Sequence, residues 1–172
     1  MKIQIIGASG SGKTTLGKYI SNQLGINFID TDKYYWKDAK NNVPNSIKER
    51  EQIFLKDLYI DRDNWVVSGS IFSWNKTHLM DKDIIIYLSL NEDKRIERLV
   101  KRIERNPNYG ENGLDFLIWA KNYFNETDVT KGGTHLCHMA ELEVIKSQTQ
   151  AKIIYLNGED SVEENFKKIK QF

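Results

Sequence analysis

Residues 7–14 read GASGSGKT and follow directly on the apolar run KIQII at residues 2–6. Gly7 and Gly12, with four residues between them, precede Lys13 and Thr14, so every fixed position of the pattern G-x-x-x-x-G-K-[ST] is filled. Glycines let the backbone turn successive N–H groups inward, and the positive end of the following helix completes a nest for an anion. The segment therefore predicts a strand, a phosphate-binding loop and a helix in immediate succession.

The chemistry of such a loop predicts a nucleoside triphosphate as ligand. Lys13 is expected to reach the β- and γ-phosphates, and the Thr14 hydroxyl to bind the Mg²⁺ ion that bridges them. The loop residues expected to contact the nucleotide are Gly7, Ala8, Ser9, Gly10, Ser11, Gly12, Lys13, Thr14 and Thr15. The alternative, a flexible turn without a ligand, does not explain why the segment joins an apolar run to a well-patterned helix.

The rest of the chain alternates apolar runs with helical patterns. Short runs rich in isoleucine or valine predict buried strands at 2–6, 26–30, 64–68, 83–88 and 152–156. Helical patterns cover 13–24, 46–60 and 91–105, and the capping boxes SIKE (46–49) and SVEE (161–164) open the second and the last helix. The alternation predicts an α/β fold, the three-layer P-loop NTPase architecture with a five-stranded parallel sheet, as one domain over residues 1–172.

Residues 106–133 interrupt this alternation. NPNYGENG, from residue 106, is turn-forming, a helical stretch follows over about 114–124, and TKGGTH contains a glycine pair. We predict a lid-like helical insertion here, the most mobile part of the chain. Its only cations are Lys121 and Lys131.

Composition excludes several classes of protein. The 25 basic and 24 acidic residues give a formal charge of +1, so no global positive field favours nucleic acid or an anionic membrane as partner. No stretch approaches the ~20 apolar residues of a membrane span, and Cys137, the only cysteine, cannot form an internal disulfide. We expect a cytoplasmic protein, a monomer or a homodimer, that does not contact membranes.

Two aspartates end the second predicted strand in the sequence FIDTD. Asp30 and Asp32 stand at the carboxyl edge of the sheet, where open α/β folds place their ligands. On a strand they would face the same side, because side chains alternate. A turn or helix-capping role is the alternative, since aspartates often end strands.

With these motifs the chain resembles the small P-loop kinases of the shikimate, gluconate and nucleoside monophosphate kinase group. It looks most like bacterial adenylate kinase-like, or topology-modulation, proteins. The resemblance rests on GASGSGKT, the DTD at 30–32, WVVSGS at 65–70 and IIIYLSLNEDKRIERLVKRIER at 84–105. It implies that Asp30 supports the magnesium shell and that Asp32 contacts the acceptor hydroxyl, roles that suit carboxylates in phosphoryl transfer.

The third predicted strand departs from the nucleoside monophosphate kinase pattern. A D-G pair usually follows the apolar run, whereas this chain has Ser68 and Gly69. No acidic Walker B residue is evident, so magnesium would depend on Thr14, Asp30 and water. Gly69 and Ser70 are expected at the acceptor site, because a glycine at a strand end permits close backbone approach.

Four arginines form a stripe beside the apolar face of the predicted helix 91–105, at positions 95, 98, 102 and 105. Arg95 is predicted to be a solvated surface charge, because Glu92 and Glu97 are close by. The kinases that the chain resembles carry lid arginines in this region, so Arg102 and Arg105 are expected to contact the nucleotide, with Arg102 also catalytic. Residues 106–133 contain no arginine, which argues against an arginine finger from the insertion itself.

Other residues with metal-binding or stacking chemistry give weaker signals. His135 and His138 have no further ligand near in sequence, so a structural or surface role is favoured over a metal site. Tyr34, Tyr35 and Trp36 either stack on an acceptor ring or pack in the core.

The combined prediction is an enzyme, a single-domain kinase that transfers the γ-phosphoryl group of Mg-ATP to a small hydroxyl or phosphate acceptor. ATP rather than GTP follows from the resemblance, and no NKxD-like guanine-reading segment is present. Two rivals remain open: a nucleotide-dependent ATPase or switch without an acceptor, and a nucleic-acid-associated protein of the topology-modulation type.

Overall fold

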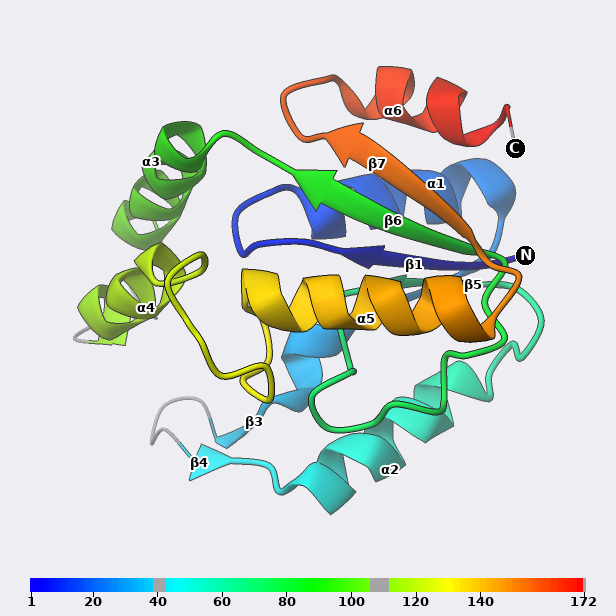
Figure 1. Cartoon of the computed structure of the whole chain (residues 1–172), viewed down its shortest axis with the longest axis horizontal. Helices are drawn as coiled ribbons and strands as arrows, with labels where there is room; N and C mark the ends of the chain where they lie inside the picture. The colour runs from blue at the N-terminus through cyan, green and yellow to red at the C-terminus, as the bar shows by residue number, and fades with distance from the viewer. Residues whose placement is uncertain (39–42, 106–111, 172) are drawn as a thin grey trace.

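The computed structural model describes residues 1–38, 43–105 and 112–171 (Figure 1). Its main sheet has five strands in the order β2-β5-β1-β6-β7, and each pair of neighbours is parallel. The predicted five-stranded parallel sheet is confirmed. The strands are β1 (Lys2–Ile6), β2 (Asn27–Asp30), β5 (Trp65–Ser68), β6 (Ile84–Ser89) and β7 (Lys152–Asn157).

Helices cover both faces of this sheet and make three layers. Ile3 and Ile5 of β1 pack with α1 and α6 on one face, whereas Ile6 packs with α5 on the other. The alternation follows from the strand period of two. The α-helices are α1 (Lys13–Leu24), α2 (Ile47–Leu58), α3 (Glu92–Glu104), α4 (Asn112–Lys121), α5 (His135–Gln148) and α6 (Val162–Ile169).

Most helix ends predicted from the sequence lie within two or three residues of those in the structure. Both predicted capping boxes are present, with Ser46 and Glu49 at α2 and Ser161 and Glu164 at α6 bonded reciprocally. The NPNYGENG segment lies mostly in residues 106–111, outside the described part of the chain. In the described residues no helix has the length and apolarity needed to cross a membrane.

Helix α5, which lies in front of the sheet in Figure 1, is not predicted from the sequence. Its buried residues are helically spaced, but they include His138 and Glu141 beside Cys137, Leu142 and Ile145. Two polar residues on the buried side blur the apolar stripe by which helices are found.

The chain after β2 also differs from prediction. Residues Thr31–Tyr34 form a 3₁₀ turn, η1, followed by a small antiparallel pair, β3 (Trp36–Asp38) and β4 (Val43–Pro44). Asp32 thus lies beyond the strand, so the prediction that both aspartates alternate on one strand is wrong. Asp30 instead caps η1, its carboxylate accepting a hydrogen bond from the Asp32 N–H at 3.2 Å.

Candidate active site

The phosphate loop joins β1 to α1 with three glycines at positive φ: Gly7, Gly10 and Gly12. A Cβ atom at Gly7 would lie 2.3 Å from the Leu88 carbonyl oxygen, so the loop's contact with β6 requires glycine there. At the start of α1 Gly12 offers no side-chain cap, and the first turn contains no acidic residue. The positive helix end is therefore left to an anion.

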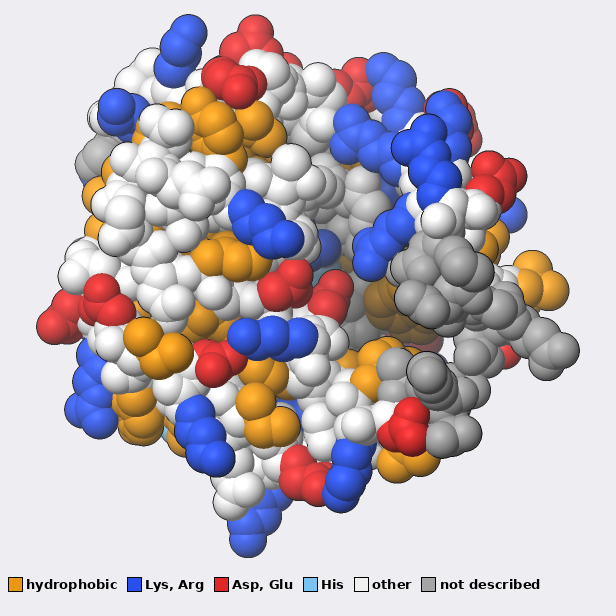
Figure 2. All heavy atoms as spheres, turned by 180° about the vertical axis from the view of Figure 1, so that it is seen from behind, with side chains coloured by type: hydrophobic (Ala, Val, Ile, Leu, Met, Phe, Trp, Pro, Cys, Tyr) orange, Lys and Arg blue, Asp and Glu red, His pale blue; other side chains and the backbone are white. Residues whose placement is uncertain are grey.

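A cleft of about 500 Å³ opens beside this loop. Figure 2 shows the hollow from behind, with lysine and arginine side chains gathered over α3 on one side and carboxylates on the other. Of the predicted site residues, the cleft brings together Ser9 to Thr15, Asp32 and Arg102, whereas Gly7, Ala8 and Arg105 do not line it. Further lining residues are Leu16, Leu88, Arg98, Leu99, Gly158, Asp160, Ser161, Val162 and Asn165.

Lys13 is folded back onto its own loop. Its Nζ donates to the Ala8 carbonyl at 2.9 Å. Burial lowers the pKa of Lys13, while the nearby carboxylates of Asp32 and Asp30 oppose that shift. The ammonium lies in the lining of the cleft, where a bound phosphate would compensate for the hydration that burial removes.

Thr14, Asp30 and Ser68 bring three oxygen-bearing side chains together. The Thr14 hydroxyl donates to Asp30 Oδ2 at 3.2 Å and lies 3.4 Å from Ser68 Oγ. Hydroxyl and carboxylate oxygens suit Mg²⁺, which keeps several waters, so the group fits the ion that the loop implies. Ser68 was missed as a participant, although its place at the end of the third strand of the sequence was the available signal.

The structure contradicts the prediction for Arg95. Its side chain is 1% exposed and is not a solvated surface charge. Glu92 is its partner, as the sequence suggested, but the guanidinium also donates to the Ser9 and Ala120 carbonyls. Local spacing gave the ion pair and could not show the two distant acceptors.

Arg98 is a cleft residue that sequence reasoning did not select for the nucleotide. It lines the cleft and donates to the Gly158 carbonyl at 3.0 Å, on the loop between β7 and α6. Arg105 is the exposed C-cap of α3. The side of the cleft formed by α3 therefore contains Arg98 and Arg102.

Gly69 and Ser70, which were expected at the acceptor site, do not line the cleft. Gly69 has φ 114°, and a Cβ atom there would lie 1.9 Å from Thr31 Oγ1. The close approach that glycine permits is thus made by Thr31, whose hydroxyl donates to the Ser68 carbonyl at 3.1 Å. Ser70 Oγ donates to Glu141 Oε2 at 2.6 Å.

A buried polar network on α5 supports these residues. Gln4 Nε2 donates to Glu141 Oε1 at 2.8 Å and to the Gly69 carbonyl at 3.1 Å. Lys82 Nζ lies 3.9 Å from Glu141. Burial raises the pKa of Glu141 and lowers the pKa of Lys82 to about 8. Glu141 thus connects α5 to β1 and to the segment that follows β5.

The histidines of α5 take part in a second buried network. Tyr123 Oη lies 2.9 Å from His138 Nδ1 and 3.1 Å from Tyr87 Oη. Burial lowers the pKa of His138 to about 3, so the ring is neutral. Within the described residues no group of three or more His, Cys, Asp or Glu side chains is placed to hold a metal ion. These contacts agree with the structural role expected for His138.

The aromatic residues after the DTD segment differ in burial. Tyr34 is buried, and its hydroxyl donates to Asp57. Tyr35 and Trp36 are exposed and pack edge to face, 4.7 Å between ring centroids, and the Arg50 guanidinium lies 4.1 Å from the Tyr35 ring centre. Tyr34 is a core residue, whereas the other two remain accessible.

Comparison with known proteins identifies the family. Residues 9–136 match the family described as shikimate kinase. The chain belongs to the shikimate kinase family. As a member, it is a P-loop small-molecule kinase, in agreement with the phosphate loop and the parallel sheet.

Individual relatives cover different shares of the chain. It is 35% identical over 151 residues to uncharacterized protein YqaC of Bacillus subtilis, covering 81% of this chain and 83% of the relative. It is 30% identical over 115 residues to shikimate kinase 2 of Pectobacterium atrosepticum, which is 61% of this chain and 64% of that enzyme. The match thus spans less than two thirds of that shikimate kinase.

Solved structures agree on the fold. A shikimate kinase from Bacteroides thetaiotaomicron has a TM-score of 0.54 at 20% identity, covering 98% of this chain and 96% of that one. Deoxyadenosine kinase from M. mycoides, with bound dCTP, has a TM-score of 0.56 at 18% identity over the full length of both chains.

Proposed function

We propose that this kinase transfers the γ-phosphoryl group of Mg-ATP to a hydroxyl or phosphate group of a small molecule. One observation carries the proposal: the phosphate loop and Asp32 line the same cleft, and Thr14 of that loop is hydrogen-bonded to Asp30. Phosphoryl transfer needs mainly positioning and charge stabilisation, and this arrangement supplies both.

Each residue has a defined role in this reaction. Lys13 leaves the Ala8 carbonyl and neutralises charge on the transferred group. Thr14, Asp30 and Ser68 would hold a Mg²⁺ ion together with water, and such an ion would supply positive charge to the phosphates of the nucleotide. Asp32 orients the acceptor and takes its hydroxyl proton as the new O–P bond forms and ADP leaves.

Two arginines of α3 clamp the nucleotide. Arg98 and Arg102 line the cleft beside the phosphate loop, and a guanidinium can bind phosphate or stack on a base. Arg102 keeps the role expected from the sequence, and Arg98 replaces Arg105, which does not line the cleft.

The insertion serves as a lid in this proposal. Its described part, residues 112–133, includes α4, which packs on α3. Leu114, Ile118 and Trp119 are exposed on it. Closure over the cleft would exclude water from the transferring phosphoryl group. Lys131, one of its two cations, is paired with Glu126 at 2.8 Å.

The relatives and the surface beyond Asp32 bear on the class of the acceptor. Related proteins are shikimate kinases, and a structural neighbour is a deoxyadenosine kinase. Exposed Tyr35 and Trp36, beyond Asp32, give a ring-bearing acceptor a surface for stacking. ATP is proposed over GTP, and a cytoplasmic location stays a prediction.

The test is an ADP-release assay with a panel of shikimate-like alcohols, sugar acids, nucleosides and nucleoside monophosphates. We expect one class to raise turnover far above hydrolysis. Lys13→Ala should abolish that turnover, and Asp32→Asn should lower kcat by about 10²-fold or more. Lys101→Met is the matched control, because Lys101 is exposed on α3 and does not line the cleft.

The two rival functions make different predictions in the same assay. An ATPase or switch would show no acceptor dependence and no effect of Asp32→Asn. A nucleic-acid-associated protein would bind DNA independently of ATP with a steep salt dependence. Either result would overturn the kinase proposal.

A further inference from the structure

Arg95 is the one charged residue of α3 that is fully buried among those described, yet it does not line the cleft. Its Nε donates to Glu92 Oε2 at 2.8 Å, so its charge is compensated within the helix. Burying a charge is costly unless it is paired and hydrogen-bonded. Such a residue calls for a reason beyond the stability of α3.

The remaining donors of Arg95 join two segments that are far apart in the sequence. One Nη donates to the Ser9 carbonyl of the phosphate loop at 2.9 Å. The other donates to the Ala120 carbonyl of α4 at 2.7 Å. The guanidinium carbon also lies 5.5 Å from the centre of the Tyr123 ring. The Arg95 guanidinium thus holds the phosphate loop and the insertion together.

The contact with Ser9 has a direct consequence for the loop. The carbonyl and the next N–H of a trans peptide point in opposite directions, so fixing the Ser9 carbonyl also fixes the direction of the Gly10 N–H. Gly10 has φ 88°, and a Cβ there would lie 3.2 Å from Arg95 Cγ and 3.0 Å from Leu99 Cγ. The Ser9–Gly10 peptide of the loop is therefore oriented from α3.

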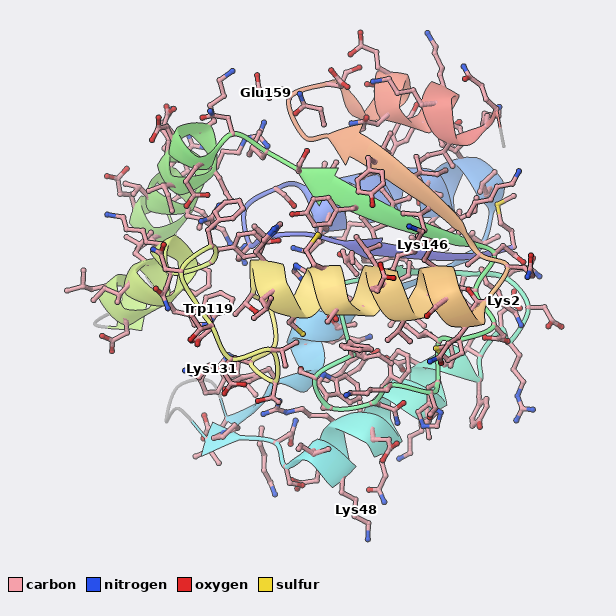
Figure 3. The ribbon with its side chains drawn as sticks, in the orientation of Figure 1. Lys2, Lys48, Trp119, Lys131, Lys146 and Glu159 are labelled. Carbon is pink, nitrogen blue, oxygen red and sulfur yellow. The ribbon has the colours of Figure 1, made fainter. Side chains whose placement is uncertain are left out.

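Trp119, the residue before Ala120, can report on the position of α4 through its fluorescence. Trp119 lies near the end of α4, on the same side of the molecule as Lys131 (Figure 3). A Cβ atom at Gly133 would lie 2.9 Å from the Trp119 ring, so the indole packs against the segment leading to α5. A shift of α4 changes the surroundings of this indole.

We propose that Arg95 is a positioning residue that couples the phosphate loop to the insertion: it orients the Ser9–Gly10 peptide for phosphate binding and moves α4 with the loop. The proposal rests on nucleotide binding at the loop, which is part of the proposed function. A lysine at this position keeps the charge but lacks the planar fork that reaches Glu92, Ser9 and Ala120 together.

The experiment titrates Mg-ADP into the full chain while tryptophan fluorescence and affinity are measured, with no acceptor present. In the wild type we expect saturable binding with a change in emission that Trp119→Phe removes. Arg95→Lys should weaken Mg-ADP binding about tenfold, the effect of a lost charge-assisted hydrogen bond, and should abolish the Trp119 response. Lys101→Met should behave like the wild type.

If Arg95 had a purely structural role, Arg95→Lys would lower the melting temperature, and its affinity for Mg-ADP at 20 degrees below that temperature would be unchanged. Wild-type affinity in Arg95→Lys would overturn the proposal, and so would weaker binding with an intact Trp119 response, or a wild type whose Trp119 is silent. If Arg95→Lys does not fold, Glu92→Gln replaces it. We then expect Mg-ADP to bind about threefold more weakly, and unchanged binding would count against the proposal.

A wild type that does not bind Mg-ADP would instead overturn the proposed function.

Discussion

At the scale of single residues, glycines decide how closely segments approach at the site. Gly69 and Gly25 both have positive φ, but only Gly69 is crowded: a Cβ at Gly25 would have nothing within 4 Å. Comparing the two positions therefore distinguishes the cost of a positive φ from the cost of steric overlap. Gly69 allows Thr31 to reach the end of β5, and Thr31 stands between the two aspartates of the site.

We predict that Gly69→Ala lowers the free energy of unfolding by about 3 kcal/mol, combining the left-handed conformation with overlap on Thr31. Gly25→Ala should cost only about 1 kcal/mol, since it adds the conformational strain alone. Urea denaturation of the two variants measures the difference. Equal losses would show that Thr31 moves aside at no cost.

At the scale of elements, α5 supports the strand ends from which the site is built. Glu141 accepts from Gln4 and Ser70, so one helix holds β1 and the segment after β5 together. A buried acceptor that is removed leaves its donors unsatisfied, which costs more than the mean value of a hydrogen bond. Glu141 therefore ties α5 to the sheet in addition to the apolar contacts of Leu142 and Ile145.

Replacing Glu141 tests that reading of α5. Glu141→Gln retains one acceptor oxygen at the same place, whereas Glu141→Leu leaves the Ser70 hydroxyl and the Gln4 amide without it. We expect Glu141→Leu to be less stable than Glu141→Gln by about 1–3 kcal/mol. Thermal and urea unfolding of both variants provide the measurement. The reverse order would mean that apolar packing governs this helix.

At the scale of the whole molecule, a buried lysine makes stability depend on pH. Burial lowers the pKa of Lys82 to about 8 from an ordinary 10.5, although Glu141 and Asp81 oppose the shift. The unfolded chain therefore holds a proton between pH 8 and 10.5 that the folded chain has released. The stabilisation from this residue is complete above pH 10.5 and is lost as the pH falls through 8.

We predict that the stability of the wild type relative to Lys82→Met increases between pH 8 and 10.5, by on the order of 3 kcal/mol at most. Urea unfolding of both proteins at several pH values in this range gives the difference. If the difference in the free energy of unfolding did not change with pH, Lys82 would be protonated in both the folded and the unfolded state over this range.

The phosphate loop, the five parallel strands and the capped starts of α2 and α6 could be predicted, because each depends on residues close together in the chain. The burial of Arg95, the presence of α5 and the approach of Ser68 to Thr14 and Asp30 become visible only in the folded molecule. These features arise where segments distant in sequence exchange hydrogen bonds away from water, so a polar residue such as Arg95 or Glu141 becomes part of the interior. Local periodicity assigns such residues to the surface, since it does not contain their partners.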